Sequence, residues 1–222
     1  MALSQQQIDY LFKAIENYSF PPDYYDFDCN VAGRLADTKT VEVKIGRDLK
    51  SGDPGQVKNG LSNVLYWGYA RVPYRAKRVS RFRESVNAFQ LTQASALFSK
   101  SLRPSVVEIK KLGLPEFSGL SFVSKIRMFL DPENSAVLDK QILKIYQHCP
   151  TTVLENLHVG KSTQIPITRN NSETYERWCS RMKEISSLYF DARFRAVDVE
   201  SGFFQLIQDG SVALAAQILK NA

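Results

Sequence analysis

The sequence predicts a mainly α-helical protein with one short β segment. Apolar residues recur at helical spacing along most of the chain, whereas apolar and polar residues alternate clearly only at 40–45. The composition, 44% hydrophobic and 23% charged over 222 residues, is typical of a folded chain that can bury its own core. We therefore expect a mainly helical fold, either one large domain or two closely packed lobes, with a short β excursion near residues 38–46.

The N-terminal helix is predicted at about 5–17, because Ser4 and Gln7 have capping-box spacing and apolar residues follow at helical intervals. Residues 18–36 show no periodicity, and the turn residues at 51–55 indicate a loop. Further helices are expected at about 56–69, 74–88, 92–100, 104–112, 121–130, 139–147, 172–190 and 198–219, the last with a break near Gly210.

The charge favours a polyanionic partner. The formal net charge is +6, and residues 71–83 contain six Lys and Arg residues and no acid. On a helix, Arg71, Arg75 and Arg78 would share one face, so we take them as candidate DNA contacts. A solvated helix face is the alternative interpretation of this run.

Cysteine spacing and hydropathy exclude several classes of protein. Cys29, Cys149 and Cys179 are too widely spaced to predict a disulfide framework or a zinc ribbon. We see no signal peptide and no apolar run long enough to span a membrane. The expectation is a protein of the cytoplasm or nucleoid, monomeric, with no bound metal and no membrane association.

The most informative stretch is 104–147. A helix ends near Gly113, a tight turn follows, and a second helix begins after Gly119. The free N–H groups at the start of that helix favour an anion such as a DNA phosphate, and glycine permits close approach. Ser118, Gly119 and Ser121 are therefore candidate DNA contacts. An ordinary αα-corner is the alternative.

The same stretch resembles the helix-hairpin-helix DNA glycosylases, the HhH-GPD superfamily of endonuclease III and adenine glycosylase. That family's core reads Leu-Pro-Gly-Val-Gly, then an apolar helix, then Val-Asp-Thr-His or Leu-Asp-Gly-Asn. Here residues 114–119 read Leu-Pro-Glu-Phe-Ser-Gly, and residues 137–139 read Val-Leu-Asp. The resemblance covers residues 112–147 and is weaker at 61–69.

What the resemblance implies is a hydrolytic enzyme. Asp139 would stabilise the positive charge that develops on the deoxyribose of an extruded nucleotide, and would orient a water. The alternative is that Asp139 only caps a helix. The aromatic residues of the weaker match, Tyr66, Trp67 and Tyr69, are candidates for the base pocket or, alternatively, for the core.

Departures from the family pattern refine this expectation. Either Glu116 or Phe117 replaces the first hairpin glycine. The place of the Schiff-base lysine found in bifunctional members falls on Leu120 or Ser121, and Lys125 lies one turn later, so the resemblance implies a monofunctional enzyme. Three separated cysteines cannot hold the family's iron–sulfur cluster. The resemblance also admits a monovalent cation bound by hairpin carbonyls.

We therefore expect two lobes. Residues 1–55 and 150–222 would form one, and residues 56–149 would form the other, with the hairpin at about 104–130. The expected function is excision of a damaged or modified base from DNA, in repair or in defence against foreign DNA. Two alternatives stay open, a non-catalytic DNA-binding module and a helical protein with a protein partner.

Overall fold

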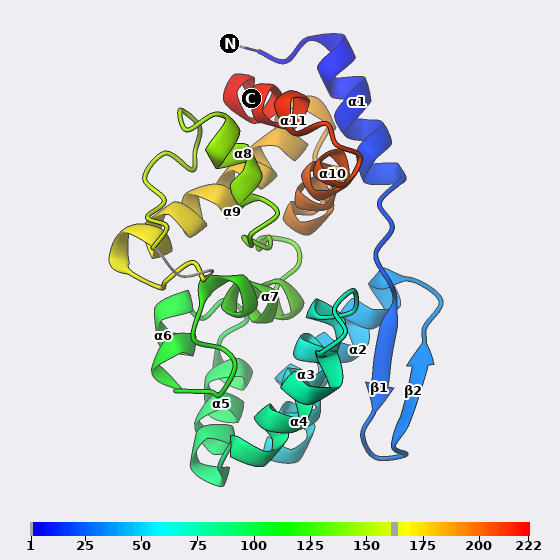
Figure 1. Ribbon diagram of the computed structural model, residues 1–222, viewed down its shortest axis with the longest axis vertical. Helices are drawn as coiled ribbons and strands as arrows, with labels where there is room; N and C mark the ends of the chain where they lie inside the picture. Colours follow the sequence, from blue (N-terminus) through cyan, green and yellow to red (C-terminus); the bar gives the residue numbers. More distant parts are fainter. Residues whose placement is uncertain (1, 161–163) are drawn as a thin grey trace. The chain divides into compact units, whose positions relative to one another are not determined.

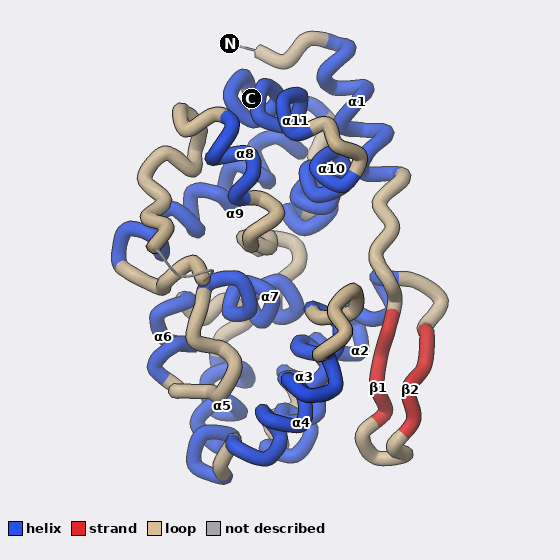
Figure 2. Tube along the Cα trace, viewed as in Figure 1, coloured by secondary structure: helices blue, strands red, loops and turns tan. Residues whose placement is uncertain are grey.

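The fold is mainly helical, as the sequence predicts. The computed structural model describes residues 2–160 and 164–222, which form eleven helices and one two-stranded antiparallel sheet (Figures 1 and 2). The chain divides into two compact units. The terminal unit comprises residues 1–19 and 132–222, and the central unit comprises residues 20–131.

The terminal unit contains five helices among its described residues. They are α1 (Gln5–Glu16), α8 (Leu143–His148), α9 (Arg169–Tyr189), α10 (Ala196–Gln208) and α11 (Val212–Asn221). The capping box of Ser4 and Gln7 is present. Helix α1 packs closely on α10, because a Cβ on Gly202 would lie 2.6 Å from Cγ1 of Ile15. The predicted break near Gly210 is confirmed, since this residue has φ of 80° between α10 and α11.

The central unit is built around a buried helix. Its elements are β1 (Asp23–Asp26), β2 (Val31–Arg34), α2 (Thr38–Lys50), α3 (Pro54–Gly68), α4 (Arg75–Ser85), α5 (Ala88–Lys100), α6 (Val106–Lys111) and α7 (Leu120–Leu130). Helix α3 contacts α2, α4, α5, α7 and strand β1. Asp53 caps it by accepting the N–H of Gln56 at 2.7 Å, and Pro54 opens its first turn.

The predicted β excursion at 38–46 is wrong, because this segment lies within α2. Val41, Ile45 and Leu49 are fully buried at intervals of four residues, whereas the side chain of Val43 is 71% exposed. The apparent alternation therefore arises from a helical stripe plus one exposed valine. Asp37 caps the helix by accepting the Thr40 N–H at 2.7 Å.

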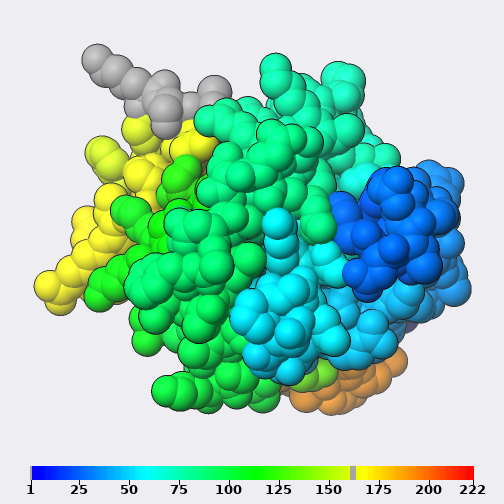
Figure 3. All heavy atoms as spheres, turned by 90° about the horizontal axis from the view of Figure 1, so that it is seen from below, coloured from blue at the N-terminus to red at the C-terminus, as the bar shows by residue number. Residues whose placement is uncertain are grey.

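The strands lie earlier, in the segment expected to be irregular. Asp23 pairs with Arg34 and Asp26 pairs with Val31, which makes a short hairpin with Asn30 in the left-handed conformation of its turn. The side-chain amide of Asn63 joins the hairpin to α3, accepting the N–H of Tyr25 at 2.8 Å and donating to its carbonyl at 3.0 Å. In Figure 3 the hairpin, in blue, stands on the surface beside the cyan residues that follow it.

The boundaries between the two units differ from those that we expected from the sequence. Residues 20–55 belong to the central unit, and residues 132–149 belong to the terminal unit. The β-hairpin and α2 pack on α3 and so join the unit that holds α6 and α7. Asp139 and the helix–loop–helix at 104–130 consequently belong to different units.

Candidate nucleic-acid interface

The helix–loop–helix expected at 104–130 is formed by α6 and α7. Ser105 begins α6 in a capping box, with its backbone N–H 2.7 Å from Oε2 of Glu108. The hydrogen bond from the Ser105 hydroxyl lowers the pKa of Glu108. After α6, Gly113 takes the left-handed conformation with φ of 62°. This glycine lets the chain turn sharply toward α7.

The start of α7 suits an anion. Gly119 is its N-cap residue, and because glycine has no side chain the usual N-cap side-chain hydrogen bond is missing. Ser118 is exposed, and Gly119 and Ser121 are half-buried. Backbone N–H groups and the positive end of the helix dipole therefore lie together where a phosphate could reach them.

The loop between the helices is held by Glu116. Its backbone is left-handed, with φ of 67°, although it carries a side chain. That conformation is one that glycine adopts without steric cost. Its carboxylate bridges Nη1 of Arg78 at 2.8 Å and Nε of Arg81 at 3.2 Å. The hydrogen bond to Glu116 raises the pKa of Arg78.

The arginines expected to contact DNA are also engaged within the central unit. Arg75 forms an ion pair with Asp23 at 2.6 Å, and its guanidinium carbon stands 4.0 Å from the ring centroid of Tyr66. The guanidinium of Arg71 stands 5.1 Å from the ring centroid of Phe20. The two contacts of Arg75 attach α4 to the hairpin and to α3.

Other cations of the basic run remain at the surface. Lys77 is exposed, and Arg71 and Arg81 are also exposed despite their contacts with Phe20 and Glu116. In contrast, Arg83 is half-buried, donates to Asn59 and Ser62 at 3.0 Å, and has its pKa lowered by burial. The basic run at 71–83 therefore contains cations that hold α4 against its neighbours and cations that face solvent.

The three aromatic candidates for a base pocket pack inside the central unit. The ring of Trp67 lies 4.6 Å from that of Phe20, and Tyr66 is buried. Tyr69 is half-buried and lies 4.5 Å from the ring of Phe122 in the first turn of α7. Tyr66 and Trp67 thus have clear structural roles, and Tyr69 is the most accessible of the three.

Asp139 lies in a loop that packs on α9. Trp178 donates its indole N–H to the carbonyl of Val137 at 3.0 Å, and the N–H of Ala136 lies 3.4 Å from Sγ of Cys179. Asp139 itself is half-buried, and its Oδ1 accepts the N–H of Gln141 at 2.9 Å. This loop holds the carboxylate in a defined position before α8.

The helix after Asp139 starts later than the expected 139. Helix α8 begins at Leu143, so Asp139 does not cap it directly. Instead, the Asp139 side chain closes a turn over Gln141, and its carbonyl accepts the Leu143 N–H at 3.1 Å. The sequence could not distinguish this turn from a helix cap, because aspartate favours both.

Lys125 is a buried amine whose position the spacing did not predict. Its Nζ reaches back one turn to the carbonyl of Ser121, at 3.2 Å. A Cβ on Gly68 would lie 2.7 Å from Cε1 of Phe122 and 3.2 Å from Cδ of Lys125. The missing side chain at Gly68 therefore makes the space in which this lysine folds back toward the start of α7.

No family model, curated protein or solved structure matches this chain. Across residues 2–160 and 164–222, no cluster of three or more His, Cys, Asp or Glu side chains has a metal-binding arrangement. Within the same residues, no helix combines the length and apolar character needed to cross a membrane.

Proposed function

We propose that this protein is a monofunctional DNA glycosylase that hydrolyses the bond between deoxyribose and a damaged or modified base. The observation that carries the proposal is the uncapped start of α7, at the end of a tight loop, in a chain of formal net charge +6. A DNA phosphate would accept backbone N–H groups there and fix the strand without reading its sequence.

The proposed reaction begins with extrusion of the target nucleotide from the duplex. Cleavage of the glycosidic bond develops positive charge on the sugar, and the carboxylate of Asp139 would stabilise this charge and orient the attacking water. Two loop carbonyls, those of Gly113 and Leu114, already accept hydrogen bonds from Gln90 and Phe117. We therefore assign no step to a cation in the loop.

Base release from modified DNA tests the proposal. Duplex oligonucleotides that each carry one damaged or modified base are incubated with the protein and then cleaved at abasic sites with hot alkali. We expect strand breaks with the wild type and a loss of about 100-fold or more for Asp139→Asn, the scale of removing a stabiliser of transition-state charge. The exposed Asp209 on the same unit offers a matched control, since Asp209→Asn should retain full activity.

The absence of lyase chemistry is tested in the same reactions. A monofunctional enzyme leaves intact abasic strands before alkali and forms no adduct with borohydride. Nζ of Lys125 reaches the carbonyl of Ser121, the residue at one of the two places expected for a Schiff-base lysine. Lys125→Gln is therefore the variant that tests for lyase chemistry. A borohydride adduct that this substitution abolishes would show that the enzyme is bifunctional.

A non-catalytic DNA-binding module is the second candidate. The hydrogen bond from the Gln141 N–H to Asp139 favours it, because this contact gives the carboxylate a purely structural task. Tight DNA binding without base release from any modified duplex would establish this function. Absence of DNA binding at low salt would instead favour a protein partner.

A further inference from the structure

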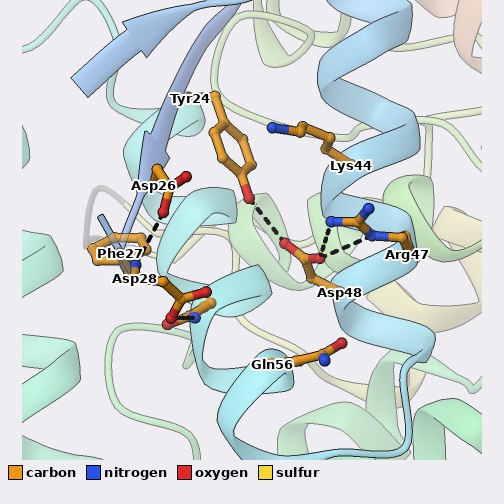
Figure 4. Close-up of a pocket in the computed structure, with 9 residues that line it drawn as sticks. Tyr24, Asp26, Phe27, Asp28, Lys44, Arg47, Asp48 and Gln56 are labelled. Atoms are coloured by element: carbon orange, nitrogen blue, oxygen red, sulfur yellow. Dashed lines mark hydrogen bonds and ion pairs between the residues drawn. The ribbon is translucent and has the colours of Figure 1, made fainter. Parts of the chain in front are cut away.

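A pocket of about 470 Å³ lies between the turn of the β-hairpin and helices α2 and α3 (Figure 4). All of its lining residues belong to the central unit. Figure 4 shows that the acidic Asp26 and Asp28 stand on the hairpin side, and that the basic Lys44 and Arg47 stand on α2. The proposed reaction on DNA uses none of these residues.

Asp26 and Asp28 form the acidic wall of the pocket, and hydrogen bonds hold this wall in place. Oδ1 of Asp26 accepts the backbone N–H groups of Asp28 at 3.0 Å and Cys29 at 2.9 Å. These hydrogen bonds lower the pKa of Asp26, and the bond from the Cys29 N–H has the largest effect. The Asp26 carboxyl group is therefore ionised at neutral pH. Nδ2 of Asn59 donates to Asp28 at 3.1 Å, and Arg83 in turn donates to Asn59. The two carboxylates are therefore pre-positioned.

An aromatic ring lies between these two carboxylates in the sequence. Phe27 lies 4.7 Å from the ring of Tyr25, and the guanidinium carbon of Arg83 is 4.1 Å from the Phe27 ring centroid. The ring is thereby fixed, and Phe27 is one of the residues that line the pocket. An aromatic side chain in the lining suits a planar cation that can also bond to a carboxylate.

The third carboxylate, that of Asp48, already forms a hydrogen bond and an ion pair with its neighbours. It accepts the Tyr24 hydroxyl at 3.0 Å and pairs with Arg47 at 3.2 Å. Burial, and then the charge of Asp48, raise the pKa of Tyr24, so the phenol stays protonated and continues to donate. Nζ of Lys44 stands 4.5 Å from the Tyr24 ring centroid. Lys44 and Arg47 form the basic wall of the pocket, and the buried Tyr24–Asp48 pair supports this wall.

The charge pattern selects one class of ligand. The lining carries three carboxylates and two cations, so its formal charge is −1. A simple anion would meet Asp26 and Asp28, and a simple diamine would meet Lys44 and Arg47; both are repelled by one wall. A ligand with a cation at one end and a carboxylate at the other complements both walls.

We propose that this pocket binds a free basic α-amino acid of the arginine type. The guanidinium faces Asp26 and Asp28, where its fork of donors matches a carboxylate and its plane can lie against Phe27. The α-carboxylate faces Lys44 and Arg47.

Calorimetric titration of the full chain, without DNA, tests the ligand class. The probes are L-arginine, agmatine, which lacks the carboxylate, and L-citrulline, whose side chain is neutral. We expect saturable binding of L-arginine and about tenfold or more weaker binding of the other two, since each loses a charged hydrogen-bonding group. Failure of L-arginine to bind overturns the proposal, as does equal affinity for agmatine or for citrulline.

Two substitutions test the walls. Asp26→Asn retains an oxygen for the turn N–H groups but removes the charge, and Lys44→Gln removes the cation; each should weaken L-arginine binding about tenfold. Lys39→Gln, on the exposed first turn of α2, is the matched control and should leave the affinity unchanged. Circular dichroism confirms folding of each variant. If Lys39→Gln weakens binding as much as Lys44→Gln, net charge explains the effect and the pocket proposal fails.

Discussion

At the scale of single residues, Glu116 combines an unfavourable backbone with a favourable side chain. Its left-handed φ of 67° costs free energy that glycine would avoid, whereas its carboxylate joins Arg78 and Arg81 across the loop. The Glu116 side chain is only 7% exposed, although both arginines reach solvent. The residue therefore fastens α4 to the loop that precedes α7.

Two substitutions at Glu116 separate the backbone from the side chain. Both Glu116→Ala and Glu116→Gly remove the ion pairs, but only glycine relaxes the left-handed conformation. We expect the glycine variant to be more stable than the alanine variant by about 1 kcal/mol, the reverse of the order within a helix. Urea unfolding measures this difference. Equal stabilities would show that the loop relaxes to another conformation when the carboxylate is lost.

At the scale of elements, the short helix α6 depends on its capping box. Ser105 and Glu108 satisfy each other's backbone N–H groups, and α6 has only six residues to stabilise itself otherwise. Replacing the cap, Ser105→Ala, should destabilise the protein by about 1 kcal/mol. Urea unfolding at neutral pH checks this value.

The capping box also predicts a pH dependence. The folded-state pKa of Glu108 lies below its ordinary value, so its ionised form stabilises the fold. This contribution is complete above the unfolded-state pKa and disappears as the pH falls through the lower folded-state pKa. Wild type should therefore be more stable than Glu108→Gln at pH 7, and the difference should vanish once the pH lies below the folded-state pKa of Glu108. A difference that persists in acid would contradict the ionic explanation.

At the scale of the whole molecule, the net charge of +6 should govern the proposed DNA binding. The logarithm of the binding constant is expected to fall linearly with the logarithm of salt concentration. Lys77 faces solvent on α4, so Lys77→Gln should reduce the slope by about one phosphate contact. Lys13→Gln, exposed on α1, is the control with the same change of charge. Fluorescence anisotropy over a salt series measures both slopes.

Arg75 should behave differently in the same experiment. Its ion pair with Asp23 and its position over the Tyr66 ring indicate that Arg75 stabilises the packing within the central unit. Arg75→Gln is therefore expected to lower the stability more than it lowers the salt slope. The opposite result would restore Arg75 to the DNA-contacting face that the sequence predicts.

The sequence by itself determined the mainly helical class, the N-terminal capping box, the break at Gly210 and the two helices around Gly113 and Gly119. These features follow from short-range patterns, namely apolar periodicity, capping residues and glycine at left-handed positions. Their physical causes lie within a few residues, so they can be read without the rest of the chain.

Only the tertiary structure decided which partners the side chains meet. The helical stripe of Val41, Ile45 and Leu49 became distinguishable from a strand only through burial against the neighbouring helices. Likewise, the pairing of Arg75 with Asp23 spans 52 residues, and that of Arg78 with Glu116 spans 38. Such contacts depend on how the helices pack, which no local pattern records, and they explain why a basic run in the sequence is partly internal in the fold.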